Sequence, residues 1–100
     1  MSRFTDRVAV VTGGGSGLGR AAAKLFGSEG GRVAVVDLAG ETAQATVDDI
    51  TAAGGTARAY GADVSDPASV QACVDAVASD LGRPQLLVNS AGIGGFARSE

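Results

Sequence analysis

Four short segments rich in apolar or β-branched residues recur along this chain, and stretches with helical spacing lie between them. They cover residues 8–12, 32–37, 56–60 and 85–89. The first two are continuous apolar runs, which are typical of strands buried on both faces of a parallel sheet. The third alternates and is less apolar, which predicts an outer strand.

The stretch after the first strand predicts an amphipathic helix that ends at Gly30-Gly31. Gly27 is an irregularity inside it. Its apolar residues recur at i, i+3, i+4, i+7 and i+8, so we expect one face to pack on the sheet: Leu18, Ala21, Ala22, Leu25 and Phe26.

Two further helices are expected. One runs from about Gly40 to Ala53 and ends at Gly54-Gly55, and its inward residues are Ala43, Val47 and Ile50. The other begins at Ser65-Asp66-Pro67, where a capping residue precedes a proline in the first turn, and Gly82 ends it. Its apolar stripe comprises Val70, Cys73, Val74, Val77 and Leu81.

The resulting order is β-α-β-α-β-α-β. Because crossovers between parallel strands are right-handed, we expect a parallel sheet with strand order 3-2-1-4. This is one half of a Rossmann-type, doubly wound α/β fold, and residues 1–100 form one domain.

The junction between the first strand and the first helix is glycine-rich, with the sequence TGGGSGLG at residues 12–19. Glycine reaches positive φ freely and keeps no side chain between the backbone and a ligand. A helix start presents unpaired N–H groups and the positive end of its dipole. A flexible linker would lack the flanking buried strand and amphipathic helix, so the junction predicts a phosphate cradle.

The glycine spacing narrows this prediction. The dinucleotide pattern G-x-G-x-x-G fails from Gly13 or Gly15, because Leu18 or Arg20 then occupies its last position. The arrangement Thr12-Gly13-x-x-x-Gly17-x-Gly19 resembles the cofactor-binding turn of the short-chain dehydrogenase/reductase family, and the resemblance extends over essentially the whole chain. It implies that the cofactor is bound here by Gly13, Ser16, Gly17, Leu18 and Gly19.

Asp37 ends the second strand and is followed by Leu38. A carboxylate at this strand end can accept hydrogen bonds from both ribose hydroxyls and would repel a 2′-phosphate. Family members that use NADP tend to carry a basic residue just before the second motif glycine or just after the acid, where this chain has Ser16 and Leu38. We therefore expect NAD as the cofactor. Alternatively, Asp37 only caps the turn that follows its strand.

Two later strand ends extend the resemblance. Asp63-Val64 resembles the family's D-V pair, which holds the adenine ring, although Asp63 could instead help to start the next helix. Asn89-Ser90-Ala91-Gly92 resembles the family's N-N-A-G segment, in which Asn89 would support the sheet beside the cofactor ribose and Ala91 and Gly92 would let the chain pass close to it. Ser90 departs from that pattern.

Composition excludes several other classes of function. The net charge is −3 and the eight basic residues are scattered, which argues against a nucleic-acid partner. No apolar run could span a bilayer and the N-terminal residues do not resemble a signal peptide, so we expect no membrane partner and a cytoplasmic location. One cysteine, Cys73, and no histidine argue against a disulfide and a metal site.

The family's catalytic serine and Y-x-x-x-K pair have no counterpart here. Tyr60 is interpreted as a strand residue and Lys24 as a solvated helix residue, so no catalytic residue is assigned. We expect the chain to be the cofactor-binding half of an enzyme that interconverts alcohols and carbonyls and forms a homotetramer or homodimer. Because residues 85–89 are too apolar for a natural sheet edge, the isolated chain should be poorly soluble or partly unfolded.

Two other interpretations remain open. The chain could be a nucleotide-binding or regulatory module without catalysis, and a Y-x-x-x-K motif in the continuation of the reading frame would decide for the enzyme. It could also be a Rossmann protein that binds S-adenosylmethionine, which places an acid after its second strand as well. A titration comparing NADH with S-adenosylmethionine separates that case.

Overall fold

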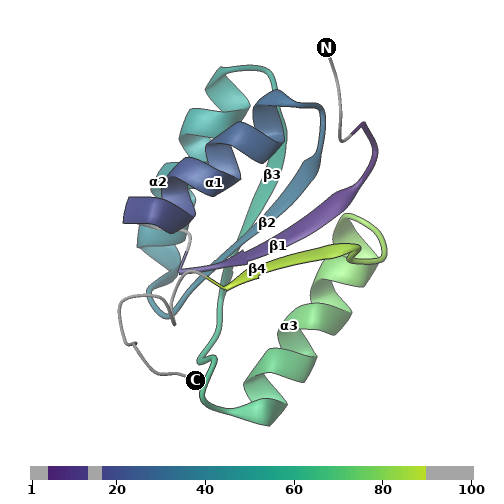
Figure 1. The fold of residues 1–100 in the computed structure, drawn as a ribbon. Helices are drawn as coiled ribbons and strands as arrows, with labels where there is room; N and C mark the ends of the chain where they lie inside the picture. Colours follow the sequence, from purple (N-terminus) through teal and green to yellow (C-terminus); the bar gives the residue numbers. More distant parts are fainter. Residues whose placement is uncertain (1–4, 14–16, 90–100) are drawn as a thin grey trace.

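The computed structural model describes residues 5–13 and 17–89. The elements follow the predicted order (Figure 1). Strands and helices alternate as β1 (Val8–Thr12), α1 (Gly17–Ser28), β2 (Arg32–Asp37), α2 (Gly40–Ala52), β3 (Thr56–Gly61), α3 (Pro67–Asp80) and β4 (Leu86–Asn89).

The described strands form one four-stranded parallel sheet in the order β3-β2-β1-β4. The predicted Rossmann-type topology is therefore confirmed, and β3 occupies the outer position that its weaker apolar pattern indicated. Val10 lies opposite Ala34 of β2 and Leu87 of β4, so these three side chains share one face. β4 starts at Leu86, one residue later than expected, although the Gln85 N–H still donates to the Val8 carbonyl at 2.9 Å.

The helices cover the two faces unequally. In Figure 1, α1 and α2 lie together on one face of the sheet and α3 lies alone on the other. The core under α1 and α2 comprises Ala9, Val11, Ala23, Phe26, Val33, Val35, Ala43, Val47 and Ile50, all at most 6% exposed. The core under α3 comprises Val8, Val10, Ala34, Val36, Ala62, Val77 and Leu81.

The inward face predicted for α1 is confirmed at Phe26 and is otherwise wrong. Leu18 and Leu25 are 63% and 58% exposed, and Ala21 is exposed as well. The buried residues of this helix are instead Gly19, Ala23, Phe26 and Gly27. Three of these four residues are small, and Phe26 is the one large side chain that α1 buries.

Gly27 shows how close that packing is. A Cβ at this position would lie 2.8 Å from Cγ2 of Ile50 on α2, which is closer than carbon atoms can approach without rearrangement. Gly27 is therefore a contact between α1 and α2, and its interpretation as an irregularity is wrong.

The other two helices are closer to expectation. Ala43, Val47 and Ile50 of α2 are buried, and Gly54 ends the helix region with φ +92°. In α3 the predicted cap is confirmed, because the Asp66 carboxylate accepts a hydrogen bond from the Ala68 N–H at 3.1 Å. The α3 stripe is buried only in part: Val77 and Leu81 are, whereas Val70 is 37% exposed.

Candidate functional site

The carboxyl ends of the strands meet at one edge of the sheet. Thr12 lies opposite Val36 and Asn89, and Asp37 lies opposite Gly61. The glycine turn, the Asp37 loop, the Asp63 loop and the end of β4 therefore gather at this edge, as the parallel topology requires. Ser16, Ala91 and Gly92, and the side chain of Asn89, lie outside the described residues.

The described flanks of the glycine turn have the backbone that a phosphate cradle needs. Gly13 has φ +68° after β1, and Gly17 has φ +56° where α1 begins. Among the described residues outside its own helix turn, no heavy atom lies within 4 Å of a Cβ placed on Gly17, so backbone conformation, and not crowding, makes glycine favourable there. The first turn of α1 thus starts directly at the carboxyl edge.

The Asp37 carboxylate is fixed locally. Its Oδ1 accepts a hydrogen bond from the backbone N–H of Leu38 at 2.8 Å, which is the turn contact that the alternative interpretation describes. The Leu38 side chain is 75% exposed beside it. The Ala62 N–H donates to the Asp37 carbonyl at 3.1 Å, so the loop after β2 lies against the loop after β3.

The Asp63 carboxylate is held by Ser65. Its Oδ1 accepts from the Ser65 hydroxyl at 2.6 Å and from the Ser65 N–H at 3.0 Å. These hydrogen bonds hold the pKa of Asp63 below its usual value, since they favour the ionised form. Asp63 is also tied to the start of α3, because its N–H donates to the Ser69 hydroxyl at 3.0 Å.

Thr12 also lies at this edge. The sequence places it at the start of the glycine motif but does not indicate a role for it. Its hydroxyl donates to the Val88 carbonyl at 3.4 Å, and the residue is 9% exposed. The bond joins β1 to β4 where both strands end. The sequence signal for this contact is the position of Thr12 at the start of the T-G-x-x-x-G-x-G pattern.

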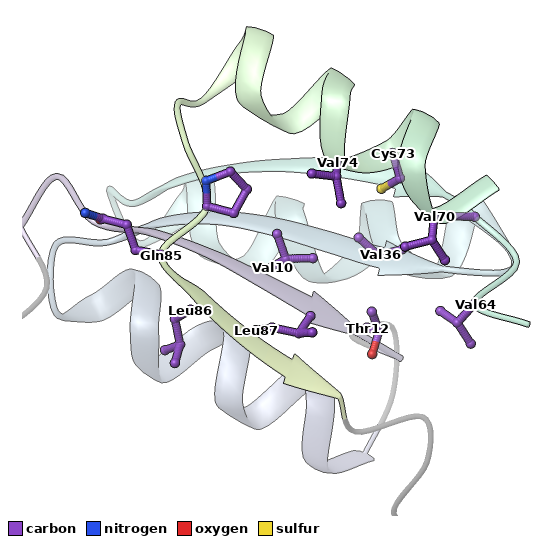
Figure 2. A pocket seen from close by; sticks show the side chains of 12 residues that line it. Val10, Thr12, Val36, Val64, Val70, Cys73, Val74, Gln85, Leu86 and Leu87 are labelled. Atoms are coloured by element: carbon purple, nitrogen blue, oxygen red, sulfur yellow. The ribbon is translucent and has the colours of Figure 1, made fainter. Parts of the chain in front are cut away.

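A groove of about 460 Å³ lies between α3 and the sheet. Figure 2 shows valines of α3 facing Val10 and Val36 across it, with Val64 and Thr12 at the end near the carboxyl edge. Its lining is almost entirely apolar and comprises Val10, Thr12, Val36, Ala62, Val64, Val70, Cys73, Val74, Pro84, Gln85, Leu86 and Leu87. The polar groups that could position a nucleotide lie at the edge, so the groove is an apolar packing surface.

The two residue types of the family's catalytic pair make other contacts in this chain. Tyr60 belongs to β3, as predicted, and its hydroxyl donates to Asp80 at the end of α3 at 2.9 Å. Lys24 lies on α1 with its Nζ 3.9 Å from Asp49, which also pairs with Arg20. Within residues 5–13 and 17–89, no helix is long and apolar enough to cross a membrane.

Comparison with known proteins gives a consistent result. Residues 7–100 match the family model described as short chain dehydrogenase. The chain is 45% identical over 98 residues to D-threitol dehydrogenase of Mycolicibacterium smegmatis. That alignment covers 98% of this chain and 38% of that protein. It is 40% identical over 98 residues to cyclohexanol dehydrogenase of an Acinetobacter species, which covers 98% of this chain and 39% of that protein.

Solved structures agree. The crystal structure of a hydroxysteroid dehydrogenase from Escherichia coli matches with a TM-score of 0.88 and 36% identity, covering 93% of this chain and 40% of that one. A metagenomic short-chain oxidoreductase in complex with NADP matches with a TM-score of 0.84 and 38% identity, covering 90% of this chain and 41% of that one. The chain thus spans about two fifths of the length of these proteins.

Proposed function

This chain belongs to the short-chain dehydrogenase family, and we propose that residues 1–100 form the NAD-binding half of an oxidoreductase acting on a small alcohol or carbonyl compound. The observation that carries the proposal is the convergence of the glycine turn with Asp37 and Asp63 at one edge of the sheet. The bound dinucleotide would supply the hydride donor or acceptor. No residue of this chain is assigned to catalysis.

The glycine turn holds the pyrophosphate. Gly13 and Gly17 have positive φ values, and the first turn of α1, with Leu18 and Gly19, directs unpaired N–H groups toward the turn. The resemblance to the family also assigns cofactor contacts to Ser16, Asn89, Ala91 and Gly92, and the proposal includes them on that ground.

Asp37 recognises the ribose and disfavours a 2′-phosphate. Its carboxylate is anchored at the sheet edge by the Leu38 N–H, which leaves it oriented to accept from a ribose hydroxyl. Neither Ser16 nor Leu38 is basic, so the proposed preference is for NAD. The NADP-bound neighbour makes this preference the part of the proposal that most needs a direct test.

Asp63 and Val64 hold the adenine. The exocyclic amine of adenine would donate to the Asp63 carboxylate, and the Val64 N–H would donate to a ring nitrogen. The exposed Leu38 side chain lies on the adjacent loop and supplies apolar surface for the ring. We also place the full-length protein in the cytoplasm as a homodimer or homotetramer.

The test is a calorimetric titration of the full-length protein with NADH, NADPH and S-adenosylmethionine. NADH should bind best, and Asp37→Ala should weaken its binding about 10- to 100-fold because hydrogen bonds to a charged group are lost. NADPH binding should not weaken, because the same change removes the charge that disfavours its 2′-phosphate. Asp48→Ala removes an exposed carboxylate of α2 that pairs only with Gln44 among the described residues, and it should leave both affinities unchanged.

Other outcomes would select other functions. Tight S-adenosylmethionine binding without NADH binding would favour a methyltransferase-like protein. NADH binding in a full-length protein that lacks a Y-x-x-x-K motif would favour the non-catalytic module. An Asp37→Ala variant that loses NADH and NADPH affinity equally would overturn the ribose role.

A further inference from the structure

We infer that Ser65 is a positioning residue that aims the Asp63 carboxylate at the cofactor's adenine; this rests on the adenine role proposed above. Both serine donors converge on a single carboxylate oxygen, with the Ser65 hydroxyl at 2.6 Å and the Ser65 N–H at 3.0 Å from Oδ1. Two bonds to one oxygen fix the plane of the carboxylate as well as its position.

The same contacts leave complementary groups for a ligand. Among the described residues, Oδ2 of Asp63 and the N–H of Val64 make no hydrogen bond, while the Asp63 N–H is taken by Ser69. One acceptor and one donor are thus presented side by side on consecutive residues. Adenine offers the matching pair, an amine donor at position 6 and an acceptor nitrogen beside it in the ring.

Ser65 does not cap α3. That role belongs to Asp66, whose carboxylate accepts from the Ala68 N–H at 3.1 Å, and the Asp66 N–H in turn donates to the Asp63 carbonyl at 3.0 Å. The two consecutive residues therefore have different roles. Asp66 stabilises the start of α3, and Ser65 orients the Asp63 carboxylate. This division makes the two roles separable by mutation.

Exposure explains why such a clamp is needed. Asp63 and Ser65 are both exposed, so no packing restricts the carboxylate, and a free side chain would sample several rotamers. Holding it in one orientation before binding reduces the entropy lost when the ligand arrives. The lowered pKa of Asp63 keeps it an acceptor across the neutral range.

The experiment compares NAD with its hypoxanthine analogue, in which a carbonyl oxygen replaces the 6-amino group. The full-length protein should bind NAD more tightly than this analogue, because the analogue cannot donate to Asp63. The preference for NAD is the dissociation constant of the analogue divided by that of NAD. Ser65→Ala should reduce this ratio about threefold to tenfold, which is the effect of losing one hydrogen bond. Ser65→Thr keeps the hydroxyl and should restore the ratio.

Asp66→Ala is the matched structural control. It should lower the melting temperature by removing the α3 cap and leave the ratio unchanged. If Ser65→Ala also left the ratio at its original value, the positioning role would be excluded. A wild-type protein that binds NAD and its analogue equally, or binds neither, would instead refute the adenine role on which the inference rests.

Discussion

The two faces of the sheet are built from the same strands but are covered to different extents. On the α1 and α2 face, Val11, Val33 and Val35 are fully buried. On the α3 face, Val10 and Val36 border an apolar groove of about 460 Å³, and Leu87 of β4 is 66% exposed. We call the first the closed face because its central strands are fully covered, although Leu86 of β4 on that face is still 43% exposed. The second, the open face, is uncovered toward β4.

The difference does not come from the strands themselves. Each strand of the central pair carries apolar residues on both faces, as a parallel sheet covered on both sides requires. What differs is the covering layer, since one helix cannot cover the width that two helices cover on the opposite side. The apolar residues of the strands therefore predict that both sheet faces are buried. How completely each face is buried depends on the number of helices that pack on it.

The largest expected effect lies on the closed face. Phe26→Ala should lower the free energy of unfolding by about 3–5 kcal/mol, because the ring is 6% exposed and packed in the core. Leu25→Ala, one residue earlier and 58% exposed, should cost less than about 1 kcal/mol. Urea unfolding of the full-length protein measures both. Equal losses would mean that the helix face predicted from spacing was the correct one.

The second prediction addresses the open face. In the isolated 100-residue chain, Leu87→Lys should raise the fraction of soluble monomer on gel filtration, because a lysine on an apolar edge strand opposes association. In the full-length protein we expect the remaining residues to cover this face. The same change should there lower the free energy of unfolding by about 2 kcal/mol, because a buried leucine side chain would be lost.

Thr56→Lys provides the control for Leu87→Lys, because it introduces the same charge at an exposed position on the opposite edge strand, β3. It should have little effect at either chain length. If the unmodified 100-residue chain proved monomeric and cooperatively folded, and Leu87→Lys changed neither protein, the open face would be a natural exposed surface.

Strand order and strand ends were predictable, and this has a physical reason. Continuous apolar runs identify β1 and β2 locally, and the handedness of crossovers then determines the sheet order without any knowledge of side-chain packing. The same topology places Asp37 and Asp63 at one edge. The general location of the site therefore followed from rules that act along the chain.

The packing of α1 was not predictable in this way. Spacing identifies where large apolar residues lie on a helix, but the inward face here depends on how near Ile50 comes to Gly27, a distance set by another helix. The clamp on Asp63 was missed for a similar reason. Its donor Ser65 is only two residues away, but the loop conformation decides whether the Ser65 hydroxyl and N–H both point at one carboxylate oxygen.

The smallest expected effect concerns the hydrogen bond between Tyr60 of β3 and Asp80 of α3. Burial and then the hydrogen bond to Asp80 raise the pKa of Tyr60 from 10.0 to about 12, so folding favours the neutral phenol. The stabilisation is therefore fully present below pH 10 and is lost as the pH rises toward 12. Because the group is partly exposed, it should amount to less than about 1 kcal/mol.

Tyr60→Phe isolates this contribution. The difference in unfolding free energy between the wild type and Tyr60→Phe should be constant below pH 10 and shrink as the pH approaches 12, because the tyrosine of the unfolded wild type ionises in this range while the folded phenol stays neutral. Asp80→Asn keeps an acceptor oxygen but removes the anion, so it should lower the folded-state pKa of Tyr60 and make the loss above pH 10 smaller. A difference that stays constant through this range would show that the phenol titrates without sensing the fold. The hydrogen bond between Tyr60 and Asp80 would then add no pH-dependent stabilisation to the contact between α3 and β3, which the ion pair between Arg58 and Asp80 also joins.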